Sequence, residues 1–407
     1  MATERRTIVF GMNTMFAVRQ FLPEVLEMAR ERGFRPVVLA PEAPVPHEVS
    51  PDMLDGIEFR SMPMKREISP LSDIRSLWRI WAILASIRPA ISNMSTPKMA
   101  LLGGLAAWLA GVPQRIYMLR GLRYETTRSW KRVLLMACER LACACAHRVI
   151  CVSKSVRDEV LRDRICRPEK VAILGDRVSE GIAVSREGVA SSSLPELRKC
   201  MGIPEGAAVI GFVGRLTKDK GIHELVEACQ ILQREGRSVH LLLLGDFEPG
   251  DPVDRAAALW IRSSPFAHWL GYVPQPRPYY EMMDVFVFPT HREGLGRVLL
   301  EAAAAGKPVI STRTTGVIDV VQDGVTGILV PPGNAKALAR ATATLLSDRE
   351  LAERMGESAR LLVEEHFDNT IYLQRLGALL ESLAEGADAA SEQSGTKPAI
   401  HTLREVQ

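Results

Sequence analysis

Short apolar segments alternate with longer amphipathic segments along this chain, and the pattern runs twice. In the first half the apolar segments predict strands at residues 8–11, 36–40, 91–93, 115–119 and 149–152, and the segments between them predict helices at 21–33, 71–88, 99–110 and 130–146. Strands that alternate with helices are typical of a parallel sheet with helices on both faces, because each parallel connection must cross the sheet. The sequence therefore predicts an α/β fold.

A second run of predicted strands and helices begins near residue 209. Its strands are predicted at 209–213, 241–244, 285–288, 308–311 and 327–330, and its helices at 221–235, 336–347, 348–365 and 369–384. The segment between the runs, residues 176–200, is rich in Ser, Gly and charge and is typical of a linker. A length of 407 residues also favours two domains, which we place at 1–190 and 200–366, with a disordered tail at 386–407.

The positive charge of the chain is concentrated in one block. The net charge is only +3, but residues 115–170 carry 14 Lys or Arg against 6 Asp or Glu. Such a block suits a phosphate-rich ligand, a nucleic acid or an anionic membrane face. Solvent-exposed helix faces would also account for the basic block, so composition leaves these alternatives open.

Neither a metal-binding cysteine pattern nor a targeting segment is visible. There are seven cysteines, and Cys143 and Cys145 are too close together for a zinc knuckle. We interpret the cysteines as reduced core thiols of a cytosolic protein without a secretory signal. The longest apolar run, residues 99–112, is shorter than the roughly 20 residues of a spanning helix, so it predicts a buried helix and leaves peripheral membrane contact open.

The stretch from Glu293 to Glu301 carries the most functional information. A predicted buried strand ends at a proline, a turn with Glu293, Gly294 and Gly296 follows, and a helix carries Glu301. Free N–H groups at a helix start suit an anion, and carboxylates accept hydrogen bonds from hydroxyl groups. Phosphate together with hydroxyl groups describes a nucleotide sugar. Glutamate in a first helical turn is also ordinary capping, but Glu301 lies among apolar residues and needs a partner.

A second glycine-containing turn, at residues 211–221, ends a predicted strand and opens a helix. Gly214 permits close approach of a ligand to the backbone. Arg215 offers a planar fork for phosphate, and Lys220 offers a point charge. A plain strand–helix turn with exposed charges would look the same in isolation.

In this order and spacing, the segments resemble the retaining group 1 (family four) glycosyltransferases of the GT-B class. The resemblance covers nearly the whole chain and is strongest between residues 209 and 334. The matching segments are 214–215, 220–221, 271–273, 293–302, 306–310, 315–327 and 331–333. The resemblance implies two Rossmann-like parallel-sheet domains that face each other across a cleft, with the C-terminal helix, 369–384, crossing back to the first domain.

The resemblance places a nucleotide-sugar donor, expected to be a UDP-sugar, on the second domain. It implies that Arg215 and Lys220 hold the diphosphate and that Glu293 contacts the sugar, which makes these three the predicted catalytic residues. It assigns Glu301 to the ribose hydroxyls. The other predicted donor-binding residues are Gly214, Tyr272, Val273, His291, Gly294, Leu295 and Gly296. Fixed cations and amide dipoles stabilise the leaving diphosphate, so neither a metal nor a cofactor is expected.

The first half resembles, through residues 93–112 and Gly121, a subgroup that extends lipid-linked sugars for surface polysaccharides. The expected reaction is hexosyl or N-acetylhexosaminyl transfer to a glycan or polyprenyl-diphosphate-linked acceptor. The expected location is cytoplasmic, with the inner face of the membrane as a candidate partner surface and no nucleic-acid partner. Arg120 stands where many members carry a histidine. The predicted acceptor-side residues are Asn13, Thr14, Arg120, Arg123 and Glu125.

Two other functions compete with glycosyl transfer. A nucleotide-sugar isomerase shares the two-domain architecture but would need acid/base carboxylates and a histidine in the cleft. A non-catalytic nucleotide-sugar scaffold is disfavoured because Arg215, Lys220, Glu293 and Glu301 are all present. An NAD or ATP enzyme is not expected, since no GxGxxG follows the first strand and Gly306-Lys307 precedes a proline.

Overall fold

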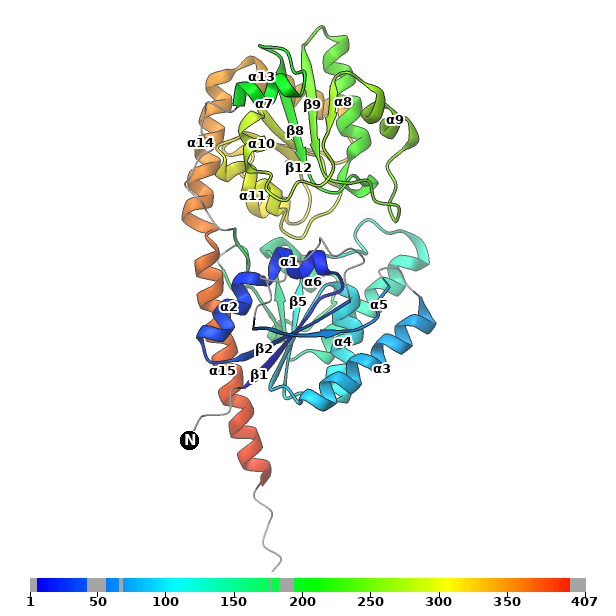
Figure 1. The fold of residues 1–407 in the computed structure, drawn as a ribbon, viewed down its shortest axis with the longest axis vertical. Helices are drawn as coiled ribbons and strands as arrows, with labels where there is room; N and C mark the ends of the chain where they lie inside the picture. The colour runs from blue at the N-terminus through cyan, green and yellow to red at the C-terminus, as the bar shows by residue number, and fades with distance from the viewer. Residues whose placement is uncertain (1–5, 42–55, 66–68, 176, 183–193, 396–407) are drawn as a thin grey trace, which may run out of the picture. The chain divides into compact units, whose positions relative to one another are not determined.

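The computed structural model describes residues 6–41, 56–65, 69–175, 177–182 and 194–395, and for 387–395 it describes the backbone alone. Within them the chain forms two Rossmann-like parallel sheets with helices on both faces, as predicted (Figure 1). Strands β1–β7 fall inside the first predicted domain and β8–β13 inside the second. The limits 1–190 and 200–366 stay a prediction, and residues 183–193 of the predicted linker lie outside the described residues.

The first sheet has the strand order β3-β2-β1-β4-β5-β6-β7. Its central strand β1 pairs in parallel with both β2 and β4. The chain thus builds outward from β1 on one side and then returns to build on the other. The bounds are β1 (Thr7–Gly11), β2 (Arg35–Ala40), β3 (Glu58–Ser61), β4 (Ile91–Ser95), β5 (Gln114–Leu119), β6 (Arg148–Cys151) and β7 (Val171–Ala172).

The helices of the first half cover this sheet and bury its apolar strands. β4 is buried at every position, as expected for a strand with a helix layer on each face. One core cluster joins Val9 and Val37 of the strands to Ile80, Leu84 and Met99 of the helices. The helices are α1 (Met15–Phe21), α2 (Pro23–Glu31), α3 (Pro70–Ile87), α4 (Pro97–Leu109), α5 (Ser129–Cys145), α6 (Lys154–Arg162) and the short 3₁₀ helix η3 (Pro168–Lys170).

The second sheet repeats this arrangement, with the order β10-β9-β8-β11-β12-β13 and parallel pairing throughout. Its central strand is β8, and the strand order reverses between β8 and β11. The strands are β8 (Ala208–Val213), β9 (Val239–Leu244), β10 (Ala267–Trp269), β11 (Val285–Phe288), β12 (Val309–Thr312) and β13 (Gly327–Val330).

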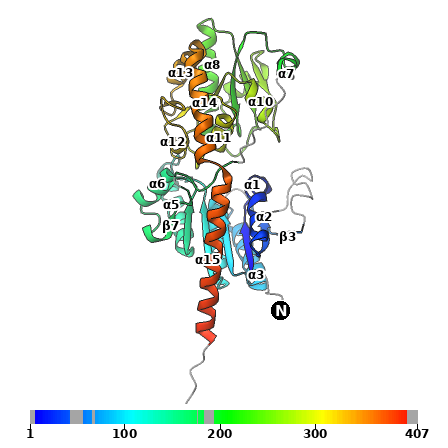
Figure 2. The same cartoon turned by 90° about the vertical axis from the view of Figure 1, so that its left-hand side faces the viewer.

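Ten helical segments accompany the second sheet and the C-terminus in the described residues. They are α7 (Leu194–Cys200), η5 (Lys218–Lys220), α8 (Ile222–Arg234), α9 (Arg255–Ser263), α10 (Arg277–Met282), α11 (Arg297–Ala304), α12 (Val317–Val320), α13 (Ala335–Ser347) and α14 (Arg349–His366), followed by α15 (Asn369–Gly395). Figure 2 shows α14 and α15 as two long consecutive helices.

The strands that the sequence did not predict are all at sheet edges. β3, β7 and β10 each end a sheet. Their residues are half-buried or exposed, so they lack the apolar run by which a central strand is recognised. The short helices α1, α7, α9, α10 and α12 were also not predicted, and α7 occupies part of the expected linker.

The chain divides into two compact units. One comprises residues 1–117, 142–148 and 373–407, and the other comprises 118–141 and 149–372. Most of α15 therefore belongs with the first unit, where Glu381 accepts a hydrogen bond at 2.7 Å from Arg32, the residue that follows α2. This confirms the predicted return of the C-terminal helix. The helix is longer than predicted, since residues 386–395 are helical; the rest of the predicted disordered tail, 396–407, lies outside the described residues.

The described residues contain no helix that is both long and apolar enough to cross a bilayer.

The packing of α15 predicts a contrast between two adjacent substitutions. Leu380 is fully buried, whereas the Glu381 side chain is 46% exposed. Leu380→Ala should lower the free energy of unfolding by roughly 2–5 kcal/mol through lost burial and a cavity. Glu381→Gln weakens only a surface ion pair and should cost less than about 1 kcal/mol. Urea denaturation measures both, and equal effects would contradict the assigned packing.

Candidate active site

The candidate site lies where the strand order of the second sheet reverses. β8 and β11 are neighbours, with Ile210 opposite Val285 and Gly211 opposite Phe286. Because the strands are parallel, the segments that follow them leave the same edge of the sheet. Ligands of open α/β sheets bind at such a reversal, beyond the carboxyl ends of the strands. The topology thus brings the turn at 214–221 beside the turn at 289–296.

Gly221 holds these two turns together. It joins η5 to α8 with φ 69°, a left-handed conformation that favours glycine. A Cβ at this position would overlap the carbonyl oxygen of Pro289, which follows β11. The backbone of the first turn can therefore approach the second only where a side chain is absent.

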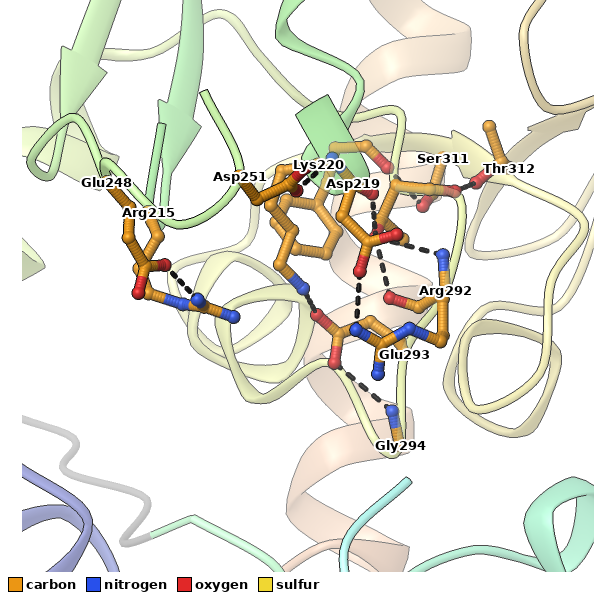
Figure 3. A network of polar contacts seen from close by, with 12 residues as sticks. Arg215, Asp219, Lys220, Glu248, Asp251, Arg292, Glu293, Gly294, Ser311 and Thr312 are labelled. Atoms are coloured by element: carbon orange, nitrogen blue, oxygen red, sulfur yellow. Dashed lines mark hydrogen bonds and ion pairs between the residues drawn. The ribbon is translucent and has the colours of Figure 1, made fainter. Parts of the chain in front are cut away.

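Lys220 and Glu293 form the centre of the site. The Lys220 ammonium donates to a Glu293 carboxylate oxygen, and the N–H of Gly294 donates to the other at 3.2 Å (Figure 3). Lys220 is only 9% exposed, and its Nζ lies 5.2 Å from the centre of the Phe288 ring. Burial lowers the pKa of Lys220, and the charge of Glu293 opposes that shift. The structure thus brings together two of the three predicted catalytic residues.

A second ion pair, which the sequence analysis missed, braces the same two turns. Arg292 donates to the carboxylate of Asp219 at 2.5 Å. The backbone N–H of Asp219 donates to Asp251 at 2.9 Å, and the N–H of His291 donates to the carbonyl of Asp219 at 2.8 Å. Asp219 lies inside the segment 211–221 and Arg292 directly precedes Glu293, but only the folded structure shows that the two side chains pair.

Arg215 follows β8 but does not join this centre. Its guanidinium pairs with Glu248, away from the Lys220–Glu293 pair (Figure 3). The side chain is 46% exposed, compared with 11% for that of Lys220. The backbone of the third predicted catalytic residue therefore lies near the site, but its side chain is paired with Glu248 instead of joining Lys220 and Glu293. Gly214 precedes it with φ 147°.

Glu301 has the partner that its apolar surroundings require. It lies on α11, and the Tyr280 hydroxyl donates to its carboxylate at 3.0 Å. Burial raises the pKa of Glu301, while the charge of Arg297 and the bond from Tyr280 oppose the shift. Tyr280 is itself almost fully buried. The site thus contains a desolvated carboxylate whose position is fixed by a tyrosine that the sequence analysis did not identify.

The remaining predicted donor residues differ in how they are held. His291 contacts Glu224, with 2.9 Å between Nε2 and the carboxylate, and this bond raises the pKa of His291. Leu295 is buried and Gly296 caps α11 with φ 69°. Tyr272 is 46% exposed, and Val273 beside it is half-buried. Their roles toward a donor stay predictions.

Two of the predicted acceptor-side residues lie in the other compact unit. Asn13 and Thr14 follow the central strand β1, at the carboxyl edge of the first sheet. Thr14 caps α1, because its hydroxyl accepts from the N–H of Ala17 at 3.1 Å. The side chain of Thr14 therefore has a structural task, and its proposed acceptor contact stays a prediction.

The other three predicted acceptor-side residues, Arg120, Arg123 and Glu125, lie in the same unit as the candidate site. Arg120 forms a buried ion pair with Glu180, and Arg123 is exposed. Glu125 accepts from the Thr315 hydroxyl at 2.8 Å. Burial raises the pKa of Glu125 to about 7, partly offset by that bond. Glu125 is therefore a carboxyl group with a pKa near neutral pH.

Gly294 is where this segment meets the candidate site. The Ser153 hydroxyl donates to the Gly294 carbonyl at 2.8 Å. A Cβ on Gly294 would overlap the carbonyl oxygen of Arg120. Close backbone packing therefore places Gly294, which also bonds to Glu293, directly beside the start of the predicted acceptor-side segment.

Among the described residues, no group of three or more His, Cys, Asp or Glu side chains is arranged to hold a metal ion. The charges at the site include the cations of Lys220, Arg292 and Arg215 and the carboxylates of Glu293 and Glu301. Such a set can hold an anion with its cations and hydroxyl groups with its carboxylates.

Solved structures share the fold over almost the whole chain. The structure of Anabaena HepE in complex with UDP-glucose has a TM-score of 0.75, with 19% identity, and the match covers 93% of this chain and 100% of that one. Sucrose-phosphate synthase from Thermosynechococcus elongatus has a TM-score of 0.76 at 20% identity, covering 94% and 100%.

A sequence relative shows closer similarity. The capsular polysaccharide biosynthesis glycosyltransferase CapM of Staphylococcus aureus is 36% identical over 327 residues, which is 80% of this chain and 86% of CapM. The lipopolysaccharide core biosynthesis glycosyltransferase LpsE of Rhizobium meliloti is 36% identical over 160 residues, 39% of this chain and less than half of LpsE (46%).

Family models match both halves of the chain. Residues 17–176 match a glycosyl transferase 4-like domain, and residues 194–362 match the glycosyl transferases group 1. The second match contains the whole Lys220, Glu293 and Glu301 constellation. With these matches and the extended similarity to CapM, the chain belongs to the group 1 glycosyltransferases and has their GT-B fold.

Proposed function

We propose that this protein transfers a sugar from a nucleotide-sugar donor, a UDP-sugar, to a glycan or polyprenyl-diphosphate-linked acceptor in surface polysaccharide or glycoconjugate biosynthesis. The observation that carries the proposal is the buried Lys220–Glu293 pair at the carboxyl ends of β8 and β11. A cation and a carboxylate at this place suit the two halves of a sugar diphosphate.

The cations act on the diphosphate. Cleavage of the bond between sugar and phosphate leaves negative charge on the leaving group. Lys220, buried and fixed by its neighbours, can stabilise that charge without reorganising solvent. Arg215 adds a fork for a second phosphate oxygen. With these fixed cations we propose transfer that requires neither a metal nor a cofactor.

The carboxylates act on hydroxyl groups. Glu293, whose other oxygen is held by Gly294, faces the sugar in this proposal, and Glu301 accepts from the ribose. Each desolvated carboxylate is costly unless it is paired, so hydroxyl donors on a ligand bind there favourably. Retention of the anomeric configuration is proposed from the resemblance to the retaining class.

The choice of donor and acceptor rests on the relatives. HepE shares the fold and was solved with UDP-glucose, which supports a UDP-sugar as donor. CapM is named for capsular polysaccharide and LpsE for the lipopolysaccharide core, which supports a surface glycan or its lipid-linked precursor as acceptor. An acceptor of that kind brings the enzyme to the inner face of a membrane.

The first prediction tests nucleotide binding at Glu301. UDP at a hundredfold excess over its Kd should stabilise the wild type by about 2.7 kcal/mol. Glu301→Gln should bind UDP roughly 10- to 100-fold more weakly, because hydrogen bonds to a charged acceptor contribute about 1.5–3 kcal/mol. Thermal shift against UDP, GDP and ADP measures both effects. Glu357→Gln, on the exposed surface of α14, is the matched control and should bind as the wild type does.

Three outcomes of that measurement are informative. Preference for GDP or ADP would correct the donor. Unchanged UDP affinity in Glu301→Gln would contradict the assigned ribose contact. No shift with any nucleotide would contradict the proposed function.

The second prediction tests the catalytic cation. Lys220→Met should lower kcat by about 100- to 1000-fold, the usual effect of removing a donor to developing charge. It also strands the Glu293 carboxylate, which destabilises the fold. The double variant Lys220→Met/Glu293→Gln removes both charges, so it should regain stability but not activity. UDP release in the presence of polyprenyl-diphosphate-linked oligosaccharide, with thermal melting alongside, separates the two effects; wild-type kcat in the double variant would refute the role.

The third prediction concerns Glu125. Its pKa is raised from 4.5 to about 7 in the folded state, so the native state binds the proton more tightly than the unfolded state. The contribution is stabilising below about pH 4.5 and is lost as pH rises through about 7. Glu125→Gln should remove this fall in the free energy of unfolding, measured by urea denaturation at pH 5 and 8. Glu169→Gln, on the exposed surface, should leave the pH dependence unchanged.

A further inference from the structure

One face of α5 exposes large apolar side chains. Trp130 is 68% exposed, Val133 66%, Leu134 43% and Leu141 46%. Spacings of three, four and seven residues bring these side chains onto the same side of a helix. Figure 1 shows α5 as a long helix of the first half. Apolar side chains gathered on one helix face mark an interaction surface, whereas scattered ones do not.

The other side of α5 is firmly packed, so the exposed face has a fixed orientation. Glu139 is 5% exposed. Arg132 pairs with Asp163 at 3.3 Å and lies over the Tyr124 ring, 5.6 Å from its centre. Arg140 donates to the carbonyl of Asp163 at 3.1 Å. These contacts fix which residues face outward.

The exposed charged residues of the segment 118–141 are all positive. Arg123, Arg128 and Lys131 are exposed, in or just before the first turn of α5. The acidic residues of the segment 118–141 are Glu125, which is half-buried against Thr315, and Glu139, which is buried. A tryptophan and aliphatic residues bordered by Lys and Arg are the chemistry of a helix that lies in the headgroup layer of an anionic bilayer.

Two other helices expose large apolar side chains, but fewer exposed basic residues surround them. Leu361 on α14 is 51% exposed, but it lies between Glu357 and Glu364 of the same helix. α3 exposes Leu71, Ile74 and Trp78 beside two exposed arginines, and its one aspartate is half-buried and paired with Lys98. α5 is distinguished by lying in the block of 14 basic against 6 acidic residues.

We propose that the face of α5 formed by Trp130, Val133, Leu134 and Leu141, with Arg123, Arg128 and Lys131, docks on an anionic lipid bilayer. The inference rests on the proposed function, because a polyprenyl-linked acceptor lies in a bilayer and would bring the protein to it. The tryptophan and the aliphatic residues enter the interface, and the basic residues contact lipid phosphates.

Vesicle flotation tests the proposal. The full-length protein should float with phosphatidylcholine vesicles that contain about 30–40% phosphatidylglycerol. Its partition onto vesicles of phosphatidylcholine alone should be roughly 100-fold weaker, because each of the three basic residues near an anionic leaflet contributes about fivefold. Raising the salt to about 0.5 M should weaken the binding by screening the charges. Trp130→Glu/Leu134→Glu should reduce partition at least tenfold, since burying one large apolar side chain contributes about that much.

Matched variants separate the parts of the surface. Arg128→Glu/Lys131→Glu should lose the preference for phosphatidylglycerol, and Leu361→Glu, an equally exposed leucine, should float as the wild type does. The UDP-induced thermal shift should be the same in all these variants, which shows that they are folded and keep the donor site. Turnover on an acceptor carrying a short, water-soluble prenyl chain should also be preserved.

Several results would overturn the proposal. Absence of flotation on anionic vesicles would do so, and so would flotation that survives the α5 substitutions but is lost in Ile74→Glu/Trp78→Glu. If Trp130→Glu/Leu134→Glu instead dissociates a dimer seen by light scattering, the face binds a second copy of the chain. Failure of the proposed function appears separately, as loss of UDP binding with vesicle binding intact.

Discussion

The buried ion pair of Lys220 with Glu293 is the interaction on which the candidate site depends. It connects turns that are far apart in the sequence and adjacent only because β8 and β11 are neighbours. Breaking a buried pair by removing one partner costs about 3–5 kcal/mol, since the remaining charge is stranded. The same cost makes each partner receptive to a ligand of the right charge. The pair thus keeps the two turns together and holds charges ready for a sugar diphosphate in the proposed function.

The sequence predicted the parts of the fold that are set by burial. Residues 241–244 of β9 and the whole of β11 are continuous apolar runs, which are typical of a strand covered on both faces. Edge strands such as β3 and β10 are not continuous apolar runs. They pair with a neighbouring strand on one side only, and tertiary contacts rather than composition determine where they form. The C-terminal helix is a second case in which composition did not predict the structure. Small and polar residues beyond 386 indicated disorder, yet the helix continues to Gly395.

For the candidate site, the sequence identified residues but not their partners. Glu301 had to have a partner, because an isolated carboxylate among apolar residues is costly. That the partner is Tyr280 depends on the packing of α10 against the sheet, which no local pattern encodes. The same holds for two ion pairs, Asp219 with Arg292 and Arg215 with Glu248, because the partners become neighbours only in the folded chain. Residue type and spacing therefore predict what chemistry is present, whereas the fold decides which charges neutralise one another.

This neutralisation has a consequence for donor binding. Each cation of the site, Lys220, Arg215 and Arg292, is already paired with a carboxylate: Glu293, Glu248 and Asp219. A diphosphate must therefore replace carboxylates rather than fill an empty electropositive site. The Arg215–Glu248 pair is the more exposed, so its exchange costs little, because surface pairs contribute only about 0–1 kcal/mol. The buried Lys220–Glu293 pair is more costly to part, and hydroxyl groups of the sugar must then satisfy Glu293. On the proposed function, sugar and diphosphate are thus needed together, and a nucleotide sugar should engage Lys220 more completely than the nucleotide alone.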